Sequence, residues 1–152
     1  MDQKRRSFLL VAGSAGTLAG VGLLGVEPAR AAAWNRAGFE SKAYNDAVKN
    51  LGASAMAESR DIVITAPDIA ENGAVVPIAV TSKLPNTQSI SILAEKNPFP
   101  LAATFDVSNG AEGYASVRIK MGQTSNVRAV VKADGKFYTA VKEVKVTVGG
   151  CG

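Results

Sequence analysis

Seven short segments of alternating or β-branched sequence, separated by turn residues, constrain the fold of this chain more than any other feature. Within 114–121, for example, apolar residues alternate with Ser116, Arg118 and Lys120. Successive side chains of a strand point to opposite faces of a sheet, so this alternation predicts a strand with one buried face. The same criterion predicts strands at 61–66, 74–82, 89–95, 101–107, 114–121, 126–133 and 136–148.

Short strands at roughly ten-residue spacing predict an all-β fold, an immunoglobulin-like β-sandwich of about seven strands within 53–148. Asp134-Gly135, between the last two predicted strands, is a two-residue hairpin signal. Pro77 suggests a sheet edge or a bulge, because proline cannot donate to a strand ladder. The chain has one cysteine, so no core disulfide is available and the prediction concerns the architecture alone.

A helical pattern precedes the strands, and we expect an N-terminal helix at 34–52. Its apolar side chains recur at steps of four, with Tyr44 and Val48 widening the stripe formed by Phe39, Ala43, Ala47 and Leu51. Gly52 is a plausible stop signal. Such a stripe usually packs on the protein's own core, and docking on a partner subunit is the alternative.

The segment 1–33 resembles a cleavable twin-arginine export signal. Arg5-Arg6 precedes an uncharged stretch at 7–26, and small residues offer cleavage after Ala31 or Ala33. A permanent membrane anchor is the alternative, but five of the twenty uncharged residues are glycine. We therefore expect a periplasmic protein that is exported folded, and assembly with a partner would explain that route.

The composition excludes several function classes. Removing four basic and two acidic residues with the leader lowers the net charge from +4 to +2, and no basic cluster that would indicate nucleic-acid binding remains. The chain has no histidine, the commonest general base and metal ligand, and only one cysteine. It also lacks a glycine-rich phosphate loop. We therefore expect no metal, no bound cofactor and no catalytic site of its own.

The single cysteine lies in a Gly149-Gly150-Cys151-Gly152 terminus that follows the last predicted strand. Glycines keep the backbone thin and its torsions free, so 149–152 are expected to form a flexible arm. A cysteine buried as a small apolar residue would need a core around it, which these glycines do not offer. A thiol that carries covalent cargo is the favoured interpretation, and an intermolecular disulfide or an incidental free thiol is the alternative.

The chemistry of that thiol is expected to depend on other proteins. An ordinary cysteine has a pKa of about 8.5, and cations, histidines or helix N-termini lower it. None of these lies in the tail, and the terminal carboxylate of Gly152 has the wrong sign. We therefore expect Cys151 to react slowly until a partner's pocket activates it. A thiol redox enzyme would need a resolving cysteine or a local base, and the sequence has neither.

The tail resembles the Gly-Gly-Cys-Gly-Gly terminus of SoxY, the sulfur-carrier subunit of the bacterial thiosulfate-oxidising (Sox) system, although this sequence ends one glycine earlier. The twin-arginine leader and four internal segments also resemble SoxY, so that the likeness covers the chain in order. The segments are 66–77, 95–102 (without Phe99), 123–127 and 130–136.

The resemblance implies a fold, partners and a cargo. SoxY proteins fold as an immunoglobulin-like sandwich and form a heterodimer with SoxZ. The haem enzyme SoxXA joins thiosulfate to the carrier cysteine, here Cys151. The hydrolase SoxB then releases sulfate, and SoxCD oxidises the remaining sulfane sulfur where it is present. The implied function is a non-catalytic periplasmic carrier. The alternative is a structural sandwich whose terminal cysteine forms an intermolecular disulfide.

Overall fold

The computed structural model describes residues 34–108 and 110–147, so the predictions made for 1–33 and for the arm 149–152 lie outside the described residues. Two short helices come first, and the strands follow in the order β1 (Met56–Glu58), β2 (Ile62–Thr65), β3 (Ile69–Ala70), β4 (Val76–Ser82), β5 (Thr87–Ala94), β6 (Leu101–Asp106), β7 (Tyr114–Ile119), β8 (Ser125–Ala133) and β9 (Lys136–Val146). In this part of the chain, no helix has the length and apolar character needed to span a membrane.

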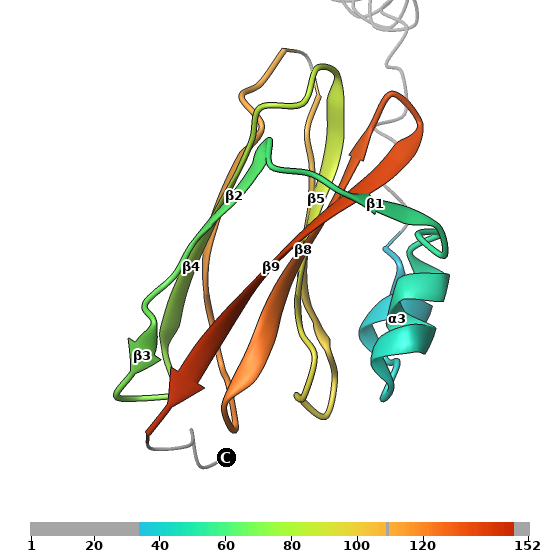
Figure 1. Cartoon of the computed structure of the whole chain (residues 1–152). Helices are drawn as coiled ribbons and strands as arrows, with labels where there is room; N and C mark the ends of the chain where they lie inside the picture. Colours follow the sequence, from blue (N-terminus) through green and yellow to red (C-terminus); the bar gives the residue numbers. More distant parts are fainter. Residues whose placement is uncertain (1–33, 109, 148–152) are drawn as a thin grey trace, which may run out of the picture. The chain divides into compact units, whose positions relative to one another are not determined.

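The strands form two sheets (Figure 1). The larger sheet has the order β1-β9-β8-β5-β6, with β3 paired to β9 as well, and the smaller sheet has the order β2-β4-β7. All seven predicted strands are present, so the prediction of a mainly β fold is confirmed. β1 and β3 were not predicted, and both pair in parallel with β9.

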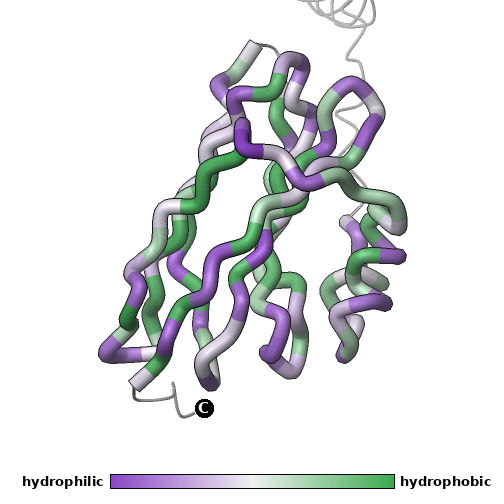
Figure 2. Tube along the Cα trace, viewed as in Figure 1, coloured by the Kyte–Doolittle hydropathy of each residue, from purple (hydrophilic) through white to green (hydrophobic). Residues whose placement is uncertain are grey.

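One apolar core lies between the two sheets. Alternate residues of facing strands are fully buried in it, among them Ile78 and Val80 of β4, Ile90 and Ile92 of β5, and Val127 of β8. The resulting alternation of hydrophobic and hydrophilic residues can be followed along the strands in Figure 2. Burial with a period of two is what the sequence pattern predicted, and it fixes the register of each strand.

A second apolar cluster covers part of the opposite face of the larger sheet. Ala47 and Val48 of α3 (Tyr44–Asn50) pack with Leu93, Leu101 and Val130 from β5, β6 and β8. The second half of β5 is consequently buried on both faces, which removes the alternation there. The helical stripe therefore packs on its own sheet, as the favoured interpretation predicted.

The helical region differs from the prediction in one respect, because it forms two helices. α2 (Arg36–Phe39) and α3 are separated by a turn in which Ala43 is extended, with φ −111° and ψ 142°. Two asparagines hold this break: Asn35 Nδ2 donates to the carbonyl of Asn50 at 2.9 Å, and Asn50 Nδ2 donates to that of Ala37 at 3.1 Å. Ala43 is consequently exposed and is not part of the packed stripe.

Three local predictions can be compared with the backbone. Gly52 ends α3 with φ +75°, the left-handed conformation that glycine favours, and its N–H donates to the carbonyl of Lys49. Asp134 and Gly135 both have positive φ, as a two-residue hairpin turn requires. Pro77 lies in the central strand β4, yet β2 pairs only with 79–82, so one side of β4 is open at Pro77.

The second cluster makes a stability prediction. Leu93→Ala should lower the free energy of unfolding by about 2–5 kcal/mol, because the side chain is fully buried between sheet and helix. Val141→Ala is the matched control: Val141 lies on the same face of the sheet but is 41% exposed, and its replacement should change stability by less than about 1 kcal/mol. Urea unfolding measures both, and equal effects would contradict the described packing.

Candidate functional site

The predicted site residues Cys151, Gly149, Gly150 and Gly152 lie outside the described residues, as do Arg5 and Arg6. The structure instead describes the chain up to Thr147, four residues before Cys151 in the sequence. We call this point the arm root and define it as Lys145, Val146 and Thr147. The contacts of these three residues hold the chain immediately before the segment that contains the cysteine.

β9 forms most of the arm root, and it extends further than its antiparallel neighbour. β8 pairs with β9 from Ala133↔Lys136 to Ser125↔Val144, so Val146 has no ladder partner in β8. On the other edge of β9, the two-residue strand β3 pairs in parallel with Lys145 and Val146. Figure 1 shows β3 beside the end of β9.

Hydrogen bonds on both edges of β9 hold the arm root. On the β3 side, Lys145 N–H donates to the carbonyl of Asp68 at 3.0 Å and Thr147 N–H donates to that of Ala70 at 3.1 Å. The Thr147 hydroxyl also donates to the carbonyl of Glu71 at 3.3 Å. On the β8 side, Val146 N–H donates to the Thr124 hydroxyl at 3.0 Å. The chain is thus fixed on both edges up to Thr147.

The segment that contains β3 is itself anchored to the body. Lys142 Nζ lies 3.0 Å from the carboxylate of Asp68 and donates to the carbonyl of Ala66 at 2.7 Å. Asp68 is largely exposed, so the ion pair alone stabilises the fold little. Met121 N–H also donates to the carbonyl of Gly73 at 2.7 Å. These contacts orient β3 along β9.

The loop between β5 and β6 is tied to the same end of the body. Asn97 Nδ2 donates to the carbonyl of Lys120 at 2.6 Å, and Lys96 N–H donates to the Ser125 hydroxyl at 3.0 Å. The SoxY-like segments 66–77, 95–102 and 123–127 therefore meet around the arm root, although they are far apart in the sequence. Thr124 and β3 were not predicted as site residues. Their position within the SoxY-like segments 123–127 and 66–77 is the sequence signal that could have indicated them.

The surface at this end combines apolar and basic side chains. Ile69, Val75 and Phe99 are each at least half exposed, and Lys96, Lys120 and Lys145 are exposed as well. In the described residues, no group of three or more histidine, cysteine or acidic side chains gathers as a metal-binding cluster. Asp68 and Glu71 of the β3 segment are exposed here too, so the arm root lies within a surface of apolar, basic and acidic side chains.

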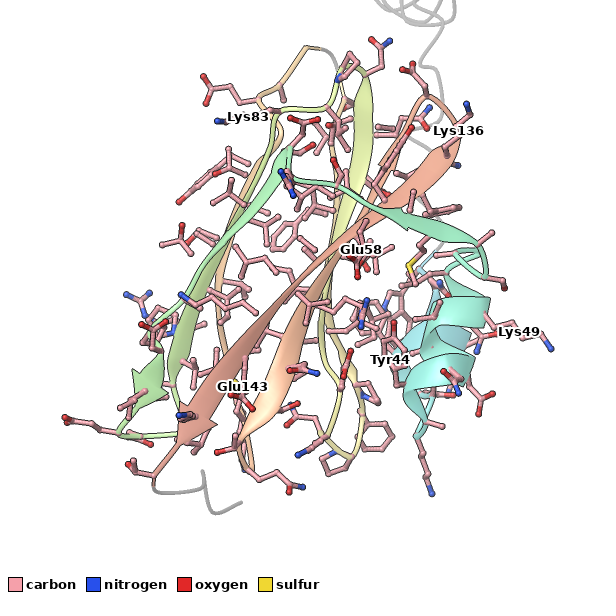
Figure 3. All side chains as sticks on the ribbon, in the orientation of Figure 1. Tyr44, Lys49, Glu58, Lys83, Lys136 and Glu143 are labelled. Atoms are coloured by element: carbon pink, nitrogen blue, oxygen red, sulfur yellow. The ribbon has the colours of Figure 1, made fainter. Side chains whose placement is uncertain are left out.

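The clearest titratable cluster of the described chain lies between α3 and the larger sheet. Arg128 Nε is 2.8 Å from Glu95 Oε1, with each side chain about one-fifth exposed, and the guanidinium lies 5.3 Å from the ring centroid of Tyr44. Figure 3 shows Tyr44 on the side of α3 that faces the sheet, whereas Lys49 points away from it. Burial raises the pKa of Tyr44 above its ordinary value; Arg128 acts in the opposite direction, and Glu95 adds to the increase. This cluster joins helix to sheet.

Comparison with known proteins gives the family of the chain. The family model "Sulfur oxidation protein SoxY" matches residues 48–151. Among solved structures, the chain is similar to the sulfur carrier protein SoxY from Chlorobium limicola f thiosulfatophilum, with 42% identity and a TM-score of 0.64 over 71% of this chain and 95% of that one. No curated protein matches.

A second likeness concerns the fold alone. A superoxide reductase (neelaredoxin) from Ignicoccus hospitalis has 20% identity to this chain and a TM-score of 0.51, over 57% of this chain and 80% of that one. The two-sheet fold, taken together with the family match and the likeness to a solved sulfur carrier, places the chain in the class of sulfur-carrier proteins. Within that class, the chain belongs to the SoxY family of sulfur carriers.

The Tyr44 pKa makes a prediction for alkaline stability. Because the folded protein binds the phenolic proton more tightly than the unfolded chain does, this contribution is complete below about pH 10 and is lost as the pH rises through the folded value. Tyr44→Phe cannot ionise, so its free energy of unfolding should decline less above pH 10 than that of the natural protein. Urea unfolding between pH 8 and 11 measures this, and parallel curves would contradict it.

Proposed function

We propose that Cys151 is the attachment point for the sulfur cargo of this carrier, and that the protein works in the periplasm as a non-catalytic subunit of the Sox system. One observation carries the proposal: the family match extends to residue 151 and so includes the only cysteine of the chain. The described body supports it, since the chain is held on both edges up to Thr147 and the thiol lies only four residues further on.

Attachment of thiosulfate to Cys151 is an oxidation. A bond forms between the cysteine sulfur and the outer sulfur of thiosulfate, the thiol proton is released, and a pair of electrons passes to the haem enzyme SoxXA. The product is a cysteine S-thiosulfonate. Hydrolysis by SoxB then breaks the bond to the sulfonate sulfur, so that sulfate leaves and a sulfane sulfur remains on Cys151. SoxCD would oxidise that sulfur where it is present.

The arm residues Gly149, Gly150 and Gly152 suit this sequence of steps. Several unrelated active sites must admit the same thiol, and glycines add no side chains that would obstruct a narrow channel. Four extended residues reach about 13–14 Å from Thr147 to Cys151, at roughly 3.3–3.6 Å each. On this proposal, the protein uses no cofactor, and the group that it carries is the sulfur cargo attached covalently to Cys151.

The proposal also includes a partner and a route. SoxZ would form the heterodimer with this chain, and the twin-arginine pair Arg5-Arg6 would direct the folded assembly to the periplasm. The two packed sheets support the immunoglobulin-like sandwich that the family resemblance implies. A structural protein that only forms a disulfide through Cys151 is the competing function.

Intact-mass analysis of the protein from thiosulfate-grown cells tests the attachment point. We expect a fraction of the molecules to carry thiosulfonate or sulfane sulfur on Cys151, and a reducing agent should remove the adducts. Cys151→Ser should carry none and should abolish thiosulfate oxidation, because an alcohol does not form these sulfur–sulfur bonds. Protein from cells grown without thiosulfate is the control. A Cys151-linked homodimer as the only modified form would support the competing function instead.

A further inference from the structure

One hydrogen bond of the arm root is made by a side chain, because the backbone of β8 supplies no acceptor at that position. In an antiparallel pair, every second residue of a strand exchanges N–H···O=C hydrogen bonds with the neighbouring strand. β8 begins at Ser125, opposite Val144, so the next N–H that faces β8, that of Val146, has no β8 carbonyl to receive it. The Thr124 hydroxyl takes that place at 3.0 Å.

The contacts on the other edge cannot replace this bond. The N–H groups of Lys145 and Thr147 face β3 and are held there, whereas that of Val146 points in the opposite direction. Val146 packs against the core and is partly buried. Without the Thr124 hydroxyl, its N–H would be partly shielded from water and would have no acceptor on the β8 side. An unsatisfied buried donor favours local opening, which would release the arm root from β8.

We propose that Thr124 is a positioning residue that fixes the pivot of the carrier arm at Thr147. The proposal rests on the function proposed above, in which partner enzymes act on Cys151 while the body is docked. With the bond in place, Cys151 lies four residues beyond the pivot. Whenever the weakened arm root opens on both edges as far as Val144, Cys151 lies seven residues beyond the last fixed residue. A longer tether gives the thiol a larger accessible volume. Its effective concentration at the entrance of a partner's channel is then lower.

The expected loss can be derived from the length of this tether. Effective concentration falls roughly as the −3/2 power of the length of a flexible linker, so lengthening from four to seven residues lowers it about twofold. If the thiol explores the whole volume within reach, the loss is about fivefold. The body surface is unchanged, so the loss should appear in the maximal rate of cargo loading, and the KM for the carrier should stay the same.

Thr124→Val tests the proposal, because valine keeps the shape of threonine and removes the hydroxyl. In the full chain, amide hydrogen exchange at Val146 should become about three- to tenfold faster, the range expected for one lost hydrogen bond. The amide of Ala129, in the fully buried part of β8, should exchange at its original rate, which separates local opening from a loss of global stability. Thr124→Ser should restore slow exchange at Val146.

Loading is measured as the rate at which Cys151 acquires the thiosulfonate mass in the presence of thiosulfate and the haem enzyme. We expect Thr124→Val to lower the maximal rate at unchanged KM, by no more than the two- to fivefold that complete opening of the arm root would give, and Thr124→Ser to restore it. Thr65→Val is the matched control, since Thr65 is exposed on β2 and its hydroxyl makes no hydrogen bond within the described chain.

The outcomes separate this proposal from the proposed function. If the natural protein never acquires cargo, the proposed function is wrong, and the exchange rate of Val146 still decides whether Thr124 holds the arm root. If the natural protein loads and Thr124→Val loads at the same rate, Thr124 does not position the arm, whether or not Val146 exchanges faster. An equal loss in Thr65→Val would also overturn the proposal.

Discussion

The pairing of β9 on both of its edges is the constraint on which the rest of the structure depends. Its eleven residues join β8 along one edge and two short parallel strands, β1 and β3, along the other. Its inward-facing residues belong to the core between the sheets, and Phe137 on its other face packs with the helical cluster. A strand held in this way gives the last residues of the chain a firm base, which an edge strand of a sheet would not provide.

This arrangement separates the chemistry of the carrier from its stability. The body is stabilised by two apolar clusters, one between the sheets and one beneath the helices, and neither contains a reactive group. The loops that meet around the arm root are held by backbone and side-chain hydrogen bonds, many of them from residues within SoxY-like segments. On the proposed function, partner enzymes would meet a surface whose loops are held by these hydrogen bonds.

The sequence allowed the principal strands to be predicted because burial in a two-sheet core has a period of two, which the alternating residues of 114–121 and 126–133 display. β1 and β3 could not be predicted, since strands of three and two residues are too short to show a period and depend on bonds to β9. The break between α2 and α3 depends on Asn35 and Asn50, fifteen residues apart. Likewise, Thr124 becomes a candidate only when the register of β8 against β9 is known.

The central claim is that the body does not shield or activate the sulfur of Cys151. The rate of its alkylation by iodoacetamide, compared with that of a peptide of residues 148–152, tests this most directly. We predict equal rates and the same dependence on pH in the protein and in the peptide. A much slower reaction in the protein would mean that the sulfur is packed against the body, and a much faster one would mean that the body activates it; either result would contradict the account.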